Sequence, residues 1–178
     1  VGTVQLGGNV TVTGAAGAVF NEAVTLAEAS DPIPAMTISA TDAAGVVTFG
    51  GTVDSKAGEA QALTVTAGGA VTFAGAIGGT DQDTKALGAL TVNTGALTDF
   101  QSGIRAASVL TNATGTVQLG GNVTALDADG VTFNEIVTLN NDISIDTTAA
   151  DGPITFGDTL DSDDTAARSL TLKAGAGD

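Results

Sequence analysis

The chain has 178 residues, of which 20 are acidic and five basic, and its formal net charge is −15 at pH 7. It contains no Cys, His, Trp or Tyr, and six Phe are its only aromatic residues. This composition excludes disulfides, thiolate and His-ligated metal sites, and Ser-His-Asp or Cys-His catalysis within the chain. It also argues against nucleic-acid binding, which needs a basic surface and usually stacking aromatics.

The first predicted elements are short strands on either side of a glycine-rich turn. Residues Thr3 to Leu6 read T-V-Q-L, a Gly-Gly-Asn turn follows, and Val10 begins the next apolar segment. Because apolar residues alternate with polar ones, each strand is expected to turn its apolar side chains to one side. Gly and Asn tolerate the positive φ that tight corners need.

The same unit, an apolar-x-apolar tripeptide followed by a turn and another apolar residue, recurs along the chain. The aligned tripeptides, about 21 residues apart on average, end at Leu6, Leu26, Phe49, Phe73, Phe100, Leu119, Leu139 and Phe156. The apolar residue four positions later is Val10, Val53, Ile77, Ile104, Val123, Ile143 or Leu160. A second strand signal ten residues before the tripeptide end occurs at Leu63, Leu90 and Val109.

A longer repeat contains these units. The sequence T-V-Q-L-G-G-N-V-T occurs at Thr3 to Thr11 and again at Thr116 to Thr124. The second copy lacks six residues where the first carries the segment around Asp31 to Pro34, as a loop in a repeat array permits. We therefore expect one β-solenoid segment over residues 1–178, with a long repeat at 3–115 and a second, partial copy at 116–178.

Strands this short cannot form a stable sheet within one unit, but they can pair with their equivalents one coil further along, about 4.8 Å away. The predicted fold is therefore all-β, a parallel β-helix of about eight coils of roughly 21 residues. In this register Phe49, Phe73 and Phe156 should stack in one ladder. The alternative is a β-sandwich of short antiparallel strands, which gives no reason for a register that recurs in one sense only.

The residues that carry the repeat resemble a known family. V-T-F-G-G-T-V at Val47 to Val53, L-T-V at Leu63 and Leu90, and V-Q-L-G-G-N-V near both ends are similar to the right-handed β-helix repeats of large bacterial secreted surface proteins, the filamentous-haemagglutinin-like and autotransporter-passenger adhesins. The resemblance implies a right-handed helix at the cell surface or outside the cell. It also implies a structural, non-catalytic rod or filament segment.

Neither end of the sequence reads as a solenoid cap. Val1 enters in the middle of a coil, and Asp178 comes two residues before the next expected apolar position. An uncapped solenoid exposes strand edges. The expected partners are therefore neighbouring repeats of a longer array or identical chains stacked end to end. We expect no nucleic-acid partner, no membrane insertion and no cofactor other than a possible calcium ion.

The acidic residues concentrate late in the chain and form the candidate metal site. Calcium binds several converging oxygen ligands, and repulsion between stacked carboxylates invites a cation. The densest group is Asp158, Asp161, Asp163 and Asp164, with Asp142 and Asp146 one coil earlier and Asp81 and Asp83 as a lesser candidate. A calcium-stabilised adhesin module is thus the first alternative function. The simpler interpretation is a solvated acidic face that maintains solubility.

Two further alternatives rest on outward residues. An outward rank of threonines is expected at Thr25, Thr48, Thr72, Thr138 and Thr155, and a flat threonine array suits an ice-binding solenoid. Against it, Gln5, Asp99 and Gln118 interrupt the rank, and Thr is a good strand residue in any case. Paired carboxylates also suit polysaccharide cleavage, but the five cations are scattered and no aromatic sugar platform exists. No catalytic residue is predicted.

Overall fold

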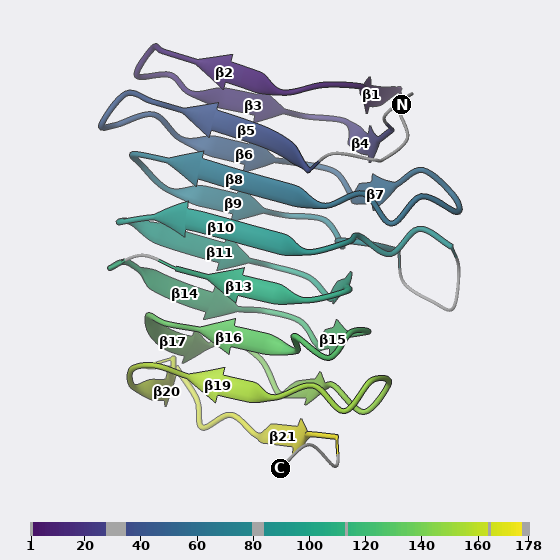
Figure 1. The fold of residues 1–178 in the computed structure, drawn as a ribbon. Coiled ribbons are helices and arrows are strands. Elements are labelled where there is room, and N and C mark those ends of the chain that lie inside the picture. Colours follow the sequence, from purple (N-terminus) through teal and green to yellow (C-terminus); the bar gives the residue numbers. More distant parts are fainter. Residues whose placement is uncertain (1, 28–34, 80–83, 113, 164, 176–178) are drawn as a thin grey trace.

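The computed structural model describes residues 2–27, 35–79, 84–112, 114–163 and 165–175. Within these ranges all regular elements are β-strands, numbered β1 to β21 (Figure 1). Because every regular element in these ranges is a strand, the all-β prediction is confirmed. The same ranges contain no helix with the length and apolarity to span a membrane.

The strands lie in three stacks, which we call sheets 1, 2 and 3 after the strands β1, β2 and β3 that they contain. Sheet 1 consists of β1 (Thr3–Leu6), β4 (Ala23–Leu26), β7 (Val53–Ser55), β12 (Ile104–Ala106), β15 (Val123–Ala125), β18 (Ile143–Asp146) and β21 (Leu170–Lys173). Sheet 2 consists of β2 (Val10–Val12), β5 (Met36–Ala40), β8 (Leu63–Ala67), β10 (Leu90–Thr94), β13 (Val109–Thr111), β16 (Val131–Phe133) and β19 (Ile154–Phe156). Sheet 3 consists of β3 (Ala18–Phe20), β6 (Val47–Phe49), β9 (Val71–Phe73), β11 (Leu97–Phe100), β14 (Thr116–Leu119), β17 (Ile136–Leu139) and β20 (Leu160–Ser162).

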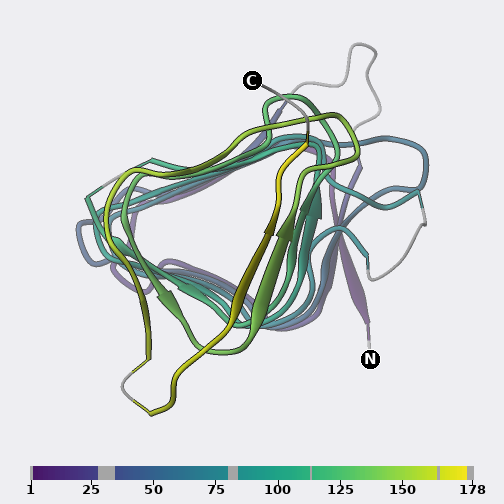
Figure 2. The same ribbon diagram turned by 90° about the horizontal axis from the view of Figure 1, so that it is seen from below.

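The chain passes through sheets 1, 2 and 3 in the same order throughout, and we call one such passage a circuit. Every strand pairing is parallel and joins strands of successive circuits, as in β6 with β9 and β14 with β17. Sheet 1 has two parts, β1-β4-β7 and β12-β15-β18-β21, and single parallel bridges from Val53 to Ile77 and from Ile77 to Ile104 connect them. Seen along the stack, the three sheets enclose a roughly triangular core (Figure 2). This arrangement is that of a β-solenoid and excludes the antiparallel sandwich.

The core consists of inward side chains that stack from circuit to circuit. In sheet 3 the Phe49 ring stacks on Phe73, with centroids 4.8 Å apart, and Phe73 stacks on Phe100 at 5.2 Å. All three side chains are fully buried, and Leu119 and Leu139 continue their ladder. The pairings of Leu63 with Leu90 and of Leu90 with Val109 in sheet 2 confirm the second predicted strand signal.

The predicted register is wrong toward both ends. Phe156 belongs to sheet 2, where it stacks on Phe133 at 5.9 Å, and not to the ladder of Phe49 and Phe73. Leu6 and Leu26 pair with each other in sheet 1. The reason is that all three sheets use the same apolar-x-apolar tripeptide. A circuit, moreover, varies from 19 residues between Phe100 and Leu119 to 29 between Phe20 and Phe49.

The two copies of the long repeat therefore occupy different sheets. T-V-Q-L forms β1 of sheet 1 in the first copy and β14 of sheet 3 in the second. The strand after the Gly-Gly-Asn turn is β2 of sheet 2 in the first copy and β15 of sheet 1 in the second. The local conformation is repeated, but its position around the axis is not.

The asparagine of the Gly-Gly-Asn turn has the same role in both copies. The Asn9 side-chain carbonyl accepts a hydrogen bond from the Thr37 backbone N–H at 2.8 Å, and Asn122 accepts one from the Ser144 N–H at 2.8 Å. Each bond links a corner to the next circuit. These two side-chain carbonyls thus satisfy backbone N–H donors at the corners between strands.

We expect Asn122→Ala to lower the free energy of unfolding by about 1 kcal/mol, because the Ser144 N–H loses its side-chain acceptor. Asn122→Asp keeps an acceptor oxygen and serves as the control. Urea unfolding followed by circular dichroism measures both variants. An equal loss in the two variants would contradict the role given to the hydrogen bond.

Candidate functional site

Of the acidic residues predicted to bind calcium, Asp158, Asp161 and Asp163 lie just before, in and just after β20, on the side of sheet 3. Asp158 precedes the strand, and its carboxylate accepts the Thr159 backbone N–H at 2.7 Å. Asp161 lies on the outer face of β20 and accepts the Ser162 N–H at 2.8 Å. Asp163 follows the strand directly, and Asp164 lies outside the described residues. Two of the four carboxylates therefore bind the backbone of the residue that follows them.

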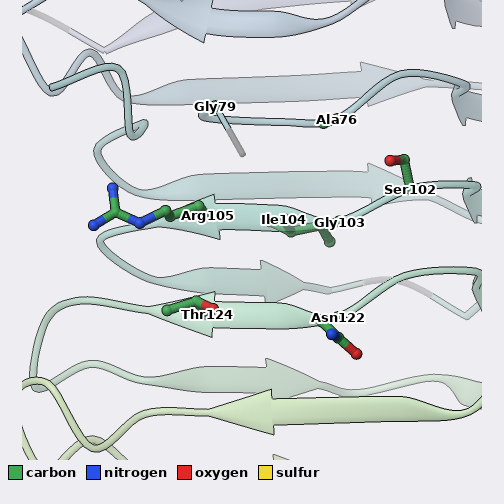
Figure 3. A pocket seen from close by; sticks show the side chains of 8 residues that line it. All are labelled: Ala76, Gly79, Ser102, Gly103, Ile104, Arg105, Asn122 and Thr124. Atoms are coloured by element: carbon green, nitrogen blue, oxygen red, sulfur yellow. The ribbon is translucent and has the colours of Figure 1, made fainter. Parts of the chain in front are cut away.

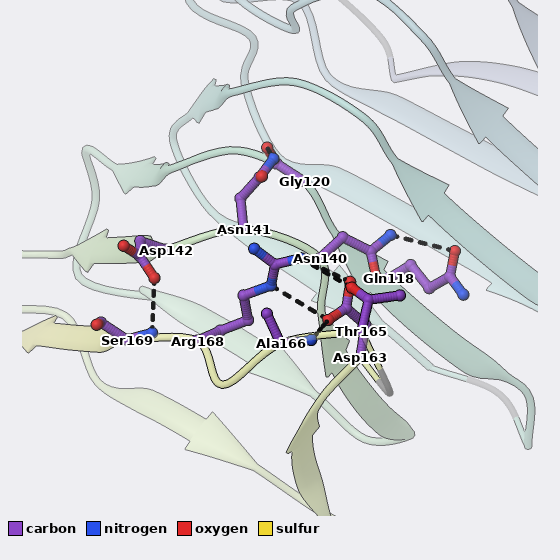
Figure 4. Close-up of polar contacts among 10 residues, drawn as sticks. All are labelled: Gln118, Gly120, Asn140, Asn141, Asp142, Asp163, Thr165, Ala166, Arg168 and Ser169. Atoms are coloured by element: carbon purple, nitrogen blue, oxygen red, sulfur yellow. Dashed lines mark hydrogen bonds and ion pairs between the residues drawn. The ribbon is translucent and has the colours of Figure 1, made fainter.

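The third carboxylate is held by a cation of the chain itself. The Arg168 guanidinium donates to both oxygens of Asp163, from Nε at 3.2 Å and from Nη2 at 2.9 Å (Figure 4). The Ala166 backbone N–H adds a third hydrogen bond at 3.2 Å. Hydrogen bonds from Arg168 in particular lower the pKa of Asp163 from 3.8 to about 2, and those same bonds raise the pKa of Arg168. A metal ion at Asp163 would have to compete with this guanidinium.

The acidic residues one circuit earlier are also engaged. Asp142 accepts the Ser169 backbone N–H at 2.8 Å, which links two circuits as the turn asparagines do. Asp146 accepts hydrogen bonds from the Thr148 hydroxyl and backbone N–H, and these bonds, together with nearby Lys173, lower its pKa.

Metal binding by the acidic group stays a prediction. Among the described residues no three or more acidic side chains lie close enough together to hold a metal ion. Asp161 and Asp163 do line one shallow hollow on sheet 3, together with the amides of Gln118 and Asn140. In this hollow, oxygen-bearing side chains from neighbouring circuits line one part of the surface.

The low pKa of Asp163 gives a pH-dependent prediction. The ion pair stabilises the fold above the usual aspartate pKa of 3.8, and its contribution is lost as the pH falls toward about 2, because the unfolded state then takes up the proton first. In an NMR titration of the carboxyl carbons, Asp163 should titrate near 2. Arg168→Gln should raise its pKa toward 3.8.

Arg105→Gln is the control for this titration, because it removes a cation from sheet 1 and leaves the contacts of Asp163 intact. A normal pKa for Asp163 in the native chain, or an equal rise in both variants, would show that Arg168 does not hold this carboxylate.

A second hollow lies on the outside of sheet 1, at the circuit where Ile77 makes only single bridges. The backbone comes very close here. Gly78 has φ +76°, and a Cβ on it would lie 1.8 Å from the Arg105 carbonyl oxygen. Figure 3 shows that the Arg105 side chain extends along the strand away from the polar groups of Ser102 and Asn122. The hollow thus brings no acid, base and nucleophile together.

The threonines predicted to form one rank are spread over three sheets. Thr25 lies in sheet 1 and Thr155 in sheet 2, whereas Thr48, Thr72 and Thr138 lie in sheet 3. The prediction of a single rank is wrong for the same reason as the phenylalanine register.

A different threonine row exists on the outer face of sheet 2, next to the residues of the second predicted strand signal, Leu63, Leu90 and Val109. Strand pairing places in one row Thr37, Thr64, Thr91, Leu110, Thr132 and Thr155. A second row, two residues further along each strand, contains Thr11, Ser39, Thr66 and Asn93. None of the seven strands of sheet 2 contains Asp, Glu, Lys or Arg. In sheets 1 and 3, by contrast, several strands carry charged side chains.

Comparison of the chain with protein-family models, with curated proteins and with solved structures finds no match.

Proposed function

We propose that this chain is a stiff, non-catalytic rod or filament segment of a secreted or surface-displayed bacterial protein, similar to the filamentous-haemagglutinin-like adhesins. One observation carries the proposal: parallel ladders of backbone hydrogen bonds and of buried side chains run through successive circuits in all three sheets. Bending such a stack would stretch the ladders on one side and compress those on the other. The acidic surface adds solubility.

We further propose that the helix is right-handed and has about eight coils, the number of levels in sheet 1 when the bridging position of Ile77 is counted with its seven strands. The direction in which the chain runs supports this handedness. In Figure 2, seen from below, the strands run leftward along sheet 2, then down sheet 3 and up sheet 1 as the chain comes toward the viewer. Because the twist of β-strands favours right-handed crossovers between parallel strands, the handedness also agrees with general chain geometry.

The proposed partners are neighbouring repeats or identical chains stacked end to end. Apolar residues of the first circuit, such as Val4, Leu6 and Val10, are only partly buried against the core. At the other end of the stack, Leu160 and Leu172 are 38% and 49% exposed. A further circuit on either side would cover these side chains and pair the open strand edges.

Electron microscopy of the native material tests the rod, because seven layers at about 4.8 Å give this chain alone a stack of only about 30–35 Å. Long unbranched fibres indicate a filament, and rods attached to other domains indicate a stalk. Compact particles without an elongated part would refute the proposal.

The alternative function is a calcium-stabilised adhesin module, and the hollow lined by Asp161 and Asp163 favours it. Because Arg168 already binds Asp163, we expect calcium to raise the unfolding temperature no more than an equal concentration of magnesium does. Thermal unfolding in calcium, magnesium and chelator measures this. A rise specific to calcium that is lost in Asp161→Asn would establish the alternative.

A further inference from the structure

The outer face of sheet 2 differs from the rest of the surface. We define the threonine face as its most regular part, Thr37 and Ser39 on β5, Thr64 and Thr66 on β8, and Thr91 and Asn93 on β10. The chain has a net charge of −15, yet no charged residue lies in any strand of this sheet. In Figure 1 these strands face the viewer, and no described segment crosses in front of them.

The threonine face is held rigidly from behind. The alternate residues on the same strands, among them Ile38, Val65 and Val92, are fully buried in the core. Threonine is also β-branched, so its χ1 angle is restricted. The hydroxyl and methyl groups therefore stand at positions set by the backbone ladder.

The ladder sets a regular spacing in two directions. Neighbouring strands lie about 4.8 Å apart, and residues i and i+2 of one strand lie about 6.6–6.8 Å apart. Both spacings are close to the repeats between oxygen atoms on a prism face of hexagonal ice. The hydroxyl groups can take lattice positions, while the methyl groups shield the water between the rows.

Other occupants fit this face less well. Its backbone groups are already paired within the sheet, so an added strand could bind only at the ends of the stack. Strands of three to five residues in seven layers give a face of a few hundred Å². The flat projection of this face is smaller than the roughly 800 Å² of accessible surface that each partner buries in a standard protein interface. An anionic ligand would find no cation in these strands, and the hollow beside Thr91 contains a carboxylate, Asp129.

We propose that the threonine face binds ice, with the row of Thr37, Thr64 and Thr91 and the row of Ser39, Thr66 and Asn93 as the contact residues. This function is independent of the proposed rod, because it needs only the outer face of β5, β8 and β10, at the border of the hollow that Thr91 lines.

Ice adsorption and ice recrystallisation of the full chain test the proposal. We expect the fluorescently labelled chain to coat a growing ice crystal and to slow recrystallisation. Thr64→Lys places an ammonium group in the centre of the face, where it cannot keep its hydration shell against the lattice. It should raise the concentration needed for the effect about tenfold or more. The matched control is Thr72→Lys, the same substitution on an outward threonine of sheet 3, which should leave the effect unchanged.

Three results would overturn the proposal. One is a native chain that stays excluded from ice, which needs no variant to interpret. Another is an equal loss of activity in Thr64→Lys and Thr72→Lys while circular dichroism shows both to be folded. The third is a dimer of the native chain in solution that Thr64→Lys dissociates, because this result would assign the face to self-association. Should Thr64→Lys fail to fold, Thr64→Tyr takes its place.

Discussion

Replacing Phe73 with alanine is expected to lower the free energy of unfolding by about 3–5 kcal/mol. The Phe73 ring is fully buried and is stacked on both faces, by Phe49 at 4.8 Å and by Phe100 at 5.2 Å. The cavity cannot close easily, because strand β9 is hydrogen-bonded to β6 on one side and to β11 on the other. Denaturant unfolding measured by circular dichroism gives the loss directly.

Two control substitutions distinguish the effect of losing the stacked ring from the effect of losing buried apolar volume. Phe73→Leu keeps most of the volume and is expected to cost about 1.5 kcal/mol or less. Phe156→Ala removes a partly exposed ring with a single stacked neighbour, Phe133 at 5.9 Å, so its cost should be well below that of Phe73→Ala. Equal losses for Phe73→Ala and Phe156→Ala would mean that the continuous ladder is not what stabilises the core.

Replacing Gly121 with alanine is expected to destabilise the fold by about 3 kcal/mol. A Cβ on Gly121 would lie 2.3 Å from the Ser102 carbonyl carbon and 2.4 Å from the Gly103 nitrogen, both of them backbone atoms of the preceding circuit. The two circuits would have to move apart at this corner, against the pairing of β12 with β15. Thermal and denaturant unfolding measure the effect.

The chain supplies its own control in Gly8, which stands in the identical sequence G-G-N-V-T. A Cβ on Gly8 meets nothing within 4 Å, so Gly8→Ala is expected to change the free energy of unfolding by no more than about 0.5 kcal/mol in either direction. Equal losses of unfolding free energy for Gly121→Ala and Gly8→Ala would contradict the close approach of the two circuits at Gly121.

The fold class and the register of the middle of the chain could be predicted from the sequence. Phe49, Phe73 and Phe100 recur at the same position of the repeated unit, each with an apolar residue four positions later, and each pairs with the next as expected. Even Thr98, the polar exception in the pattern, lies in its predicted inward position and is 1% exposed. Local alternation and turn residues carry this information, because they depend only on near neighbours in the sequence.

What could not be predicted is which sheet a strand joins. Phe156 fits the tripeptide pattern but follows Leu139 by less than any observed circuit, so it belongs to the next sheet round and stacks on Phe133. The outward row of sheet 2 was only partly predictable: the second strand signal aligns Thr64 with Thr91, whereas the pairing of Thr37 with Thr64 emerges only from the circuits. The Arg168–Asp163 pair bridges an irregular loop, and no periodicity signals it.

The placement of the two T-V-Q-L-G-G-N-V-T copies on different sheets has a consequence for how such a rod can lengthen. A duplicated stretch need not contain a whole number of turns, because a strand and corner suited to one side of the triangle fit the next side as well. A copy that is shifted by one sheet presents its outward residues on another side of the triangle, as Gln5 on sheet 1 and Gln118 on sheet 3 illustrate. In a longer array, successive copies of one surface motif can therefore lie at different angles around the solenoid axis.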